Sequence, residues 1–130
     1  SCGDEHSLRR EPAVPFALSF ERITKAHVLL NVSPIFNRGM HDRVPAGMAN
    51  HAVVLTDENP YLRRTFTDGK ELLFYSLEKP DTLCEQAERA LTDVRLREKI
   101  AASAYETFER EYTWKRRAEQ ILAFAEEVEA

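Results

Sequence analysis

The fold is decided by one stretch, which reads Leu-Leu-Asn-Val-Ser-Pro at 29–34, Gly-Met-His-Asp-Arg at 39–43 and Ala-Val-Val-Leu-Thr-Asp at 52–57. It predicts an apolar strand, a glycine-containing loop, a short helix and a second apolar strand that ends in an acid. Continuous apolar runs are typical of strands covered on both faces of a parallel sheet. Open α/β sheets bind ligands at the carboxyl ends of such strands. The stretch therefore predicts a small-molecule site, and an anion is the expected ligand.

The flanking segments extend this pattern in both directions. We expect a short helix over 20–26, a strand over 27–32 and a helix from Asp42, as N-cap, to about Asn50. The second strand covers 52–56. Asn59-Pro60 predicts the start of a helix that runs to about Phe66, and a turn at 67–70 leads to a third strand over 72–75. Residues 13–19 could add a fourth strand at the edge.

From Asp81 onward the apolar period becomes helical. Three apolar stripes are expected to face the core, and a Thr113 cap precedes the last of them. They comprise Leu83, Ala87, Ala90 and Leu91; Leu96, Ile100, Ala104 and Phe108; and Trp114, Ala118, Ile121, Leu122, Ala125 and Val128. Strands separated by helical crossovers predict an α/β fold with a Rossmann-like parallel sheet of three to four strands flanked by helices.

Size and charge restrict the class of protein. The chain has 130 residues and a net charge of −4, with acids and bases interspersed, which is typical of one domain without a nucleic-acid-binding surface. We expect a polar tail over 1–13 and a partial domain over 14–130. The chain begins with Ser rather than Met, and three or four strands are few for an independent sheet of this kind, so we expect a piece of a longer protein.

The two cysteines, Cys2 and Cys84, are too few for a disulfide framework. We expect Cys84 to be a buried thiol and Cys2 an exposed free thiol, which favours a reducing compartment. The sequence contains no apolar run long enough for a transmembrane helix and no signal-peptide pattern. Together these features predict a cytoplasmic location.

The residues Gly39, Met40, His41, Asp42 and Arg43 lie between a strand end and a helix start. Free backbone N–H groups and the positive end of the helix dipole converge at such a point, so a phosphate or pyrophosphate is the expected guest. Gly39 permits close approach, and His41 and Arg43 add positive charge. The alternative is that Asp42 caps its own helix and occupies those N–H groups.

The residues Asp57, Glu58 and Asn59 follow the next strand and border the same crevice. The adjacent acids could accept hydrogen bonds from sugar hydroxyls. The alternative is an ordinary helix start, rich in acids and capped by Asn59. The four histidines have no metal-ligand spacing, so no metal is expected.

From about Ala26 to Leu122 the chain resembles the C-terminal part of glycosyltransferases of the GT-B fold, especially the bacterial group-1-like transferases. Each piece of the pattern is weak, but the pieces occur in order. They are Leu30-Asn31, Gly39 to Val44, Val53 to Asp57, Tyr61-Leu62, Asp68 to Glu71, Phe74-Tyr75 and Tyr112 to Ala118.

The resemblance implies a donor site for a nucleotide-activated sugar, UDP- or GDP-linked, with no cofactor and no metal. Gly39 to Arg43 would meet the diphosphate, and Asp57 to Asn59 would border the sugar. Hexosyl transfer to an unknown acceptor is implied, and an N-terminal domain would supply the acceptor site and usually the catalytic base. We therefore expect no turnover from this chain alone.

The chain departs from the family pattern at three positions. Many relatives have two glutamates seven residues apart, and here those places are Arg38 and Ala46; the glycine that follows in relatives is His51. The second glutamate usually holds the ribose hydroxyls, and Asp42 is the candidate to substitute for it. A degenerate, non-catalytic Rossmann-like interaction module is therefore the main alternative, and a receiver-like domain with Asp57 as acceptor is a weaker one.

Two further expectations concern single side chains. A bidentate phosphate contact would make Arg43→Ala weaken nucleotide binding while hardly changing the melting temperature. Phe124 lies off the main apolar stripe of the last helix. It should remain exposed, so the fragment should self-associate through this helix or through the sheet edge, and Phe124→Glu should reduce that association.

Overall fold

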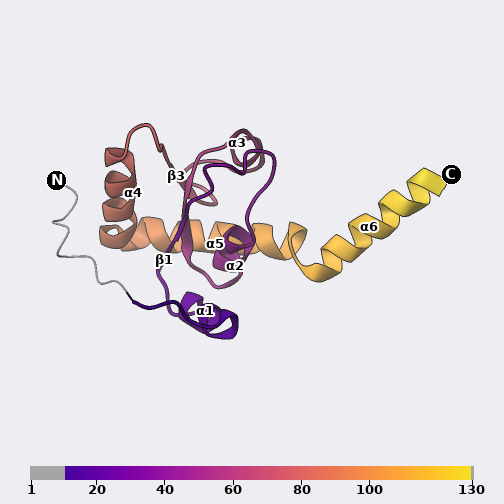
Figure 1. Cartoon of the computed structure of the whole chain (residues 1–130), viewed down its shortest axis with the longest axis horizontal. Coiled ribbons are helices and arrows are strands. Elements are labelled where there is room, and N and C mark those ends of the chain that lie inside the picture. Colours follow the sequence, from indigo (N-terminus) through magenta and orange to yellow (C-terminus); the bar gives the residue numbers. More distant parts are fainter. Residues whose placement is uncertain (1–10, 130) are drawn as a thin grey trace.

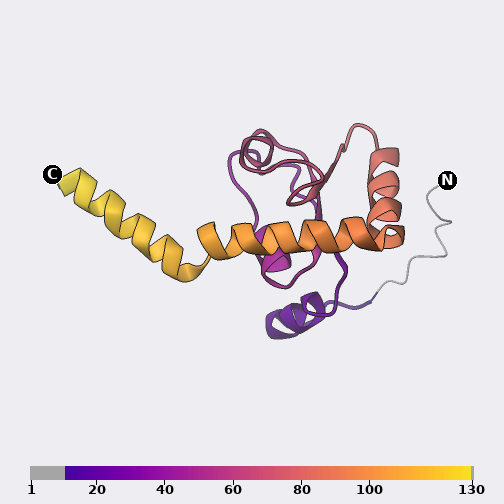
Figure 2. The same ribbon diagram turned by 180° about the vertical axis from the view of Figure 1, so that it is seen from behind.

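The computed structural model describes residues 11–129. Three strands, β1 (Val28–Asn31), β2 (Val53–Asp57) and β3 (Leu73–Tyr75), form a parallel sheet in the order β1-β2-β3. The helices are α1 (Phe16–Ile23), α2 (Arg43–Ala49), α3 (Pro60–Thr65), α4 (Asp81–Thr92), α5 (Val94–Glu111) and α6 (Trp114–Glu129). The structure is mixed α/β, with the long α5 lying across the sheet and α6 extending away from it (Figures 1 and 2). This confirms the predicted Rossmann-like fold class.

The central strand β2 is buried at every position, as its continuous apolar run predicts. Val54 faces a core cluster that includes Val44 and Met48 of α2, whereas Val53 and Leu55 face a second cluster with Ile100 of α5. Side chains alternate across the sheet, so each face needs its own helical cover. The helices thus place two apolar layers around β2 and leave β1 at an edge.

Helix α2 lies unusually close to the sheet at Gly47. A Cβ atom built at this position would lie 2.6 Å from Val54 Cγ2 and 3.0 Å from Leu29 Cδ2. The absence of a side chain therefore brings α2 onto β1 and β2. Helix α2 ends at Ala49 with Asn50 as its C-cap, and His51 follows with φ 55° and stacks its ring against that of Tyr105, with the ring centroids 4.1 Å apart. The left-handed residue is His51, at the position where the family resemblance implies a glycine.

Several predicted helix starts are confirmed by side-chain caps. Asn59 Oδ1 accepts from the N–H of Leu62 at 2.8 Å, and Pro60 opens α3. Thr113 Oγ1 accepts from the N–H of Arg116 at 3.1 Å at the start of α6. These short polar side chains satisfy amide groups that have no partner inside the helix.

Two sequence predictions near the N-terminus are wrong. Residues 13–19 form no edge strand, and the helix expected over 20–26 lies instead at Phe16–Ile23. Phe16 and Phe20 are one helical turn apart, and their rings meet edge-on with centroids 4.8 Å apart. The helical spacing of these apolar residues outweighs the strand pattern. The predicted tail over 1–13 lies mostly outside the described residues.

Two predictions about the C-terminal helices also need correction. The third apolar stripe does not face the core, since α6 has no buried residue, and Leu91 of α4 is exposed as well. The stripe on α5 is confirmed: Ile100 and Ala104 are buried, and Leu96 and Phe108 pack against the core. Amphipathic spacing predicts that a helix has an apolar face, but not what covers that face.

The predicted free thiol at Cys84 is wrong, because Cys84 is disulfide-bonded. This removes the cysteine-based argument for a reducing compartment. The prediction for Cys2 lies outside the described residues. Among residues 11–129, no helix has the length and apolar character that crossing a bilayer requires.

Candidate functional site

The carboxyl edge of the sheet contains a buried network of polar side chains. Asn31 and Asp57 are the last residues of β1 and β2, and each is at most 2 % exposed. Asn31 Nδ2 donates to Thr56 Oγ1 at 3.0 Å, and the backbone N–H of Ser33 donates to Asp57 Oδ1 at 2.8 Å. These bonds fix the start of the loop over 32–42, which we call the β1–α2 loop.

Tyr75 joins this network from the end of β3. Its hydroxyl donates to the carbonyl of Asn31 at 2.9 Å. Burial, and to a lesser degree the Asp57 carboxylate, raises the pKa of Tyr75 from 10 to about 12. The phenol therefore remains a hydrogen-bond donor at neutral pH and ties β3 to β1 across β2.

Arg43, the first residue of α2, reaches back over the β1–α2 loop. Its Nε donates to Asn31 Oδ1 at 3.0 Å, and its Nη2 donates to the Val32 carbonyl at 3.3 Å. A guanidinium has five N–H donors. The half-buried Arg43 therefore has a structural role and still has N–H groups to offer a ligand.

The start of α2 lacks the side-chain cap from Asp42 on which the alternative interpretation of the sequence depends. The Asp42 side chain makes no capping bond, and His41 Nδ1 instead accepts from the N–H of Arg43 at 3.1 Å. The same Nδ1 lies 2.5 Å from Asp42 Oδ1. One contact needs the lone pair of the ring nitrogen and the other needs its proton, so His41 makes one or the other.

Gly39 and Met40 lie just before this helix start. Within residues 11–129, neither amide N–H has a protein acceptor. The Met40 side chain packs against the core and holds the loop in place. Backbone donors therefore remain available in the loop that leads to Arg43, although the first turn of α2 is bonded internally.

The three polar residues at the end of β2 and just after it point to different places. Asp57 is buried and bonds the β1–α2 loop, whereas the exposed Glu58 forms an ion pair with Arg63 of α3. Asn59 caps α3, and its Nδ2 donates to the carbonyl of Phe36 at 2.9 Å. The structure therefore does not place Asp57 and Glu58 side by side as a pair of sugar acceptors. Asn59 has the capping role that the simpler alternative gave it.

A groove of about 360 Å³ runs between α1 and α2 and reaches the start of α2. Ala46 lines this groove together with Phe16 and Phe20 of α1, so the position at which the resemblance implies a glutamate is apolar here. Asp42 lines the same groove one turn earlier on α2. Asp42 therefore supplies a carboxylate close to Ala46, where the resemblance implies a glutamate.

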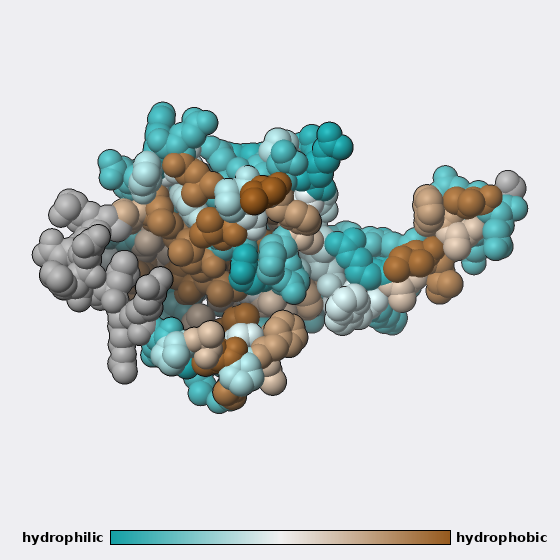
Figure 3. All heavy atoms as spheres, in the orientation of Figure 1, coloured by the Kyte–Doolittle hydropathy of each residue, from teal (hydrophilic) through white to brown (hydrophobic). Residues whose placement is uncertain are grey.

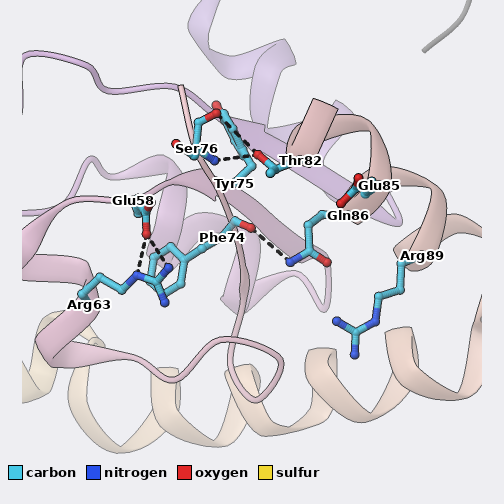
Figure 4. A pocket seen from close by; sticks show the side chains of 9 residues that line it. All are labelled: Glu58, Arg63, Phe74, Tyr75, Ser76, Thr82, Glu85, Gln86 and Arg89. Atoms are coloured by element: carbon cyan, nitrogen blue, oxygen red, sulfur yellow. Dashed lines mark hydrogen bonds and ion pairs between the residues drawn. The ribbon is translucent and has the colours of Figure 1, made fainter. Parts of the chain in front are cut away.

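A second, polar pocket of about 400 Å³ lies between α3, the end of β3 and α4 (Figure 4). The Arg63 guanidinium covers the Phe74 ring at 4.4 Å and pairs with Glu58, and Gln86 Nε2 donates to the Phe74 carbonyl at 3.1 Å. Of these residues, the sequence pattern had indicated only Glu58 as a candidate site residue. The signal that it missed was the run of polar side chains on one face of α4: Thr82, Glu85, Gln86 and Arg89.

The groups that could hold a metal are dispersed. Across the described part of the chain, no three His, Cys, Asp or Glu side chains are arranged to bind a metal ion. Every buried side-chain nitrogen or oxygen of the described residues has a hydrogen-bond partner. The buried polar network is thus internally satisfied, and ligand contacts must come from its exposed margin at the β1–α2 loop.

Comparison with known proteins assigns the chain to a family. A family model described as glycosyl transferase-like matches residues 3–123. The chain belongs to this family. No curated protein matches the chain. Family membership supports a role in glycosyl transfer and confirms the resemblance to glycosyltransferases found in the sequence. The match covers the whole sheet, the β1–α2 loop, the groove between α1 and α2, and the polar pocket beside α4.

Proposed function

We propose that this chain is the donor-binding half of a glycosyltransferase of the GT-B fold. It would bind a nucleotide-activated sugar, UDP- or GDP-linked, for hexosyl transfer to an acceptor held by another domain. A cytoplasmic location is part of this proposal. The observation that supports it most directly is Arg43, which Asn31 and Val32 hold over the β1–α2 loop, in which the amides of Gly39 and Met40 have no acceptor among the described residues.

The proposed mechanism is electrostatic stabilisation of the leaving diphosphate. Preorganised donors that point at developing charge lower a barrier without reorganising during the reaction. Arg43 is held through two of its donors, and a phosphate would meet the remaining ones together with the loop amides. Asp42 would accept from the ribose hydroxyls, since the usual carboxylate place is Ala46 in the same groove.

The exposed edge of the sheet supports a two-domain arrangement. Leu30 of β1 and Val32 after it are 47 % and 43 % exposed. No other strand of the described residues pairs with β1 on its outer side. An apolar edge strand in water is a site for pairing or for cover by another domain. We therefore expect no turnover from this chain alone.

Binding of UDP and GDP tests the proposal. Titration of the chain with either nucleotide, followed by amide NMR shifts, should move Gly39 and Met40, and affinity should fall as salt rises. Asp42→Asn should weaken UDP binding more than the binding of inorganic pyrophosphate, which has no ribose. A matched control is Glu106→Gln, which removes an exposed carboxylate on α5.

The apolar groove at Ala46 favours one alternative, a degenerate interaction module with an empty site. If millimolar nucleotide produces no heat and no NMR shifts, the degenerate module is correct and the donor-binding proposal is wrong. If binding occurs but Asp42→Asn leaves the UDP-to-pyrophosphate ratio unchanged, the phosphate part of the proposal stands and the ribose contact at Asp42 does not.

A further inference from the structure

The polar pocket between α3, the end of β3 and α4 is separate from the groups proposed to bind the donor. No residue of the β1–α2 loop lines it, and neither does Arg43. Of the residues proposed to border the donor sugar, only Glu58 lines the pocket, and its carboxylate pairs with Arg63. Hydrophilic residues predominate around α3 and the loop from β3 to α4, along the upper border of Figure 3. The pocket is therefore a second place at which a polar ligand could bind.

Contacts within the protein hold the walls of this pocket in place. On the α3 side, the Arg63 guanidinium lies over the Phe74 ring and pairs with Glu58. On the α4 side, Gln86 Nε2 donates to the Phe74 carbonyl at 3.1 Å. Its volume of about 400 Å³ lies in the usual range of small-molecule sites, about 300–1,000 Å³. The pocket is thus formed before any ligand enters it.

The α4 wall has bonding groups that the fold does not use. Glu85 and Arg89 are exposed, and neither side chain has a hydrogen-bond or ion-pair partner among residues 11–129. The amide oxygen of Gln86 is also available, since only its Nε2 is bonded. Figure 4 shows Gln86 and Arg89 extending from α4 on the side that faces Phe74 and Arg63. One helix face therefore offers a carboxylate, a guanidinium and an amide oxygen to a ligand.

The charges of the pocket favour a neutral ligand. The guanidinium groups of Arg63 and Arg89 are matched by the carboxylates of Glu58 and Glu85. An anionic ligand would meet two like charges, and an apolar ligand would take polar groups out of water without replacing their hydrogen bonds. A hydroxyl group donates one hydrogen bond and accepts others, so it suits carboxylate and guanidinium together. The lining thus fits a neutral ligand with several hydroxyl groups.

We propose that this pocket binds a neutral saccharide, apart from the donor site. Adjacent sugar hydroxyls donate to the Glu85 carboxylate and to the Gln86 amide oxygen, and they accept from Arg89. Because Glu85, Gln86 and Arg89 lie within one or two turns on one face of α4, a single sugar ring can meet all three. The site uses no nucleotide contact, so it does not depend on the proposed donor binding.

Amide NMR of the full chain tests the pocket with four neutral sugars in turn: glucose, galactose, mannose and N-acetylglucosamine. At least one should shift the amides of Ser76, Gln86 and Arg89 while those of Gly39 and Met40 stay unchanged. Its affinity should not fall as salt rises, because the ligand has no charge. UDP should shift the other set of amides, so the two proposals fail separately. If none of the four sugars shifts the pocket amides, the saccharide proposal is wrong, and a shift with inorganic phosphate alone would make the pocket an anion site.

Two variants distinguish a sugar from an anion. Arg89→Ala and Glu85→Ala should each raise the dissociation constant of the sugar several-fold, because each removes a hydrogen bond to a charged group. An anion would instead bind more tightly to Glu85→Ala, which removes a like charge. Arg95→Ala is the matched control, since Arg95 is exposed on α5, does not line the pocket and has no side-chain partner among the described residues. Equal effects of Arg89→Ala and Arg95→Ala, or tighter binding by Glu85→Ala, would overturn the proposal.

Discussion

Replacement of Gly47 by alanine should destabilise the fold and should do so through one identified contact. The new Cβ would lie 2.6 Å from Val54 Cγ2, and Val54 is fully buried in the central strand. Overpacking of this kind costs about 1–3 kcal/mol. Alanine is a better helix former than glycine by about 0.8–1.0 kcal/mol, which offsets part of that cost. The net loss should be up to about 2 kcal/mol.

A second substitution isolates the contact. Val54→Ala removes the methyl group that the new Cβ would strike and costs about 2 kcal/mol on its own by lost burial and an added cavity. In that background Gly47→Ala should become neutral or stabilising by up to about 1 kcal/mol, because the helix preference then opposes only the looser contact with Leu29 Cδ2 at 3.0 Å. The sign of the Gly47 effect should therefore change between the two backgrounds.

Urea unfolding of the four proteins in this double-mutant cycle supplies the measurement. Gly69→Ala is a useful comparison, since Gly69 has φ +78° and no atom within 4 Å of an added Cβ. Its cost comes from the backbone and should not depend on residue 54. If Gly47→Ala is equally destabilising with Val54 and with alanine at 54, the close approach of α2 to the sheet is not the reason for the glycine.

Two further outcomes follow from the polar network. Arg43→Ala should lower the free energy of unfolding by about 1–3 kcal/mol, because the Oδ1 of Asn31, a residue that is only 1 % exposed, loses the donor that lies 3.0 Å away. If this variant loses nucleotide binding while its thermal unfolding is unchanged, Arg43 serves only to bind the ligand and has no structural role. Tyr75 has its pKa raised from 10 to about 12, so the stability that it contributes is complete below pH 10 and is lost as pH approaches 12. Urea titrations across this range should show a smaller alkaline loss for Tyr75→Phe.

The order of strands and helices could be predicted from the sequence because local signals agreed with the tertiary structure. The continuous apolar run at Val53–Leu55 predicted a strand buried on both faces, and Asn59-Pro60 predicted the start of α3. The N-terminal helix was misplaced because the segment around Phe16 to Ser19 fits both a strand and a helix pattern. Its position depends on the contact between α1 and α2, which is not a local property.

The sequence predicted a candidate site at the sheet edge, but not how the side chains at that edge are bonded. Sequence spacing identified Arg43 and Asp57 as neighbours of one crevice, but it could not show that both are bonded within the protein. It also could not show that Glu58 turns away to pair with Arg63. Such outcomes depend on side-chain rotamers and on which hydrogen bonds satisfy buried atoms, and these are set by packing.

Asn59 connects α3 to the β1–α2 loop, and two substitutions separate its two tasks. Aspartate keeps the oxygen that caps Leu62 and is as good an N-cap as asparagine, but it lacks the N–H groups that reach the carbonyls of Phe36 at 2.9 Å and Gly39 at 3.5 Å. Asn59→Asp should therefore leave α3 intact and change the NMR shifts of the loop amides. Asn59→Ala loses the cap as well and should cost a further ~1–2 kcal/mol of stability. If the loop is what binds nucleotide, both variants should weaken binding to a similar degree although their stabilities differ. The division of tasks is wrong if the two variants are equally stable but differ in their loop NMR shifts. It is also wrong if the nucleotide affinities of the two variants follow their stabilities instead of their loop shifts.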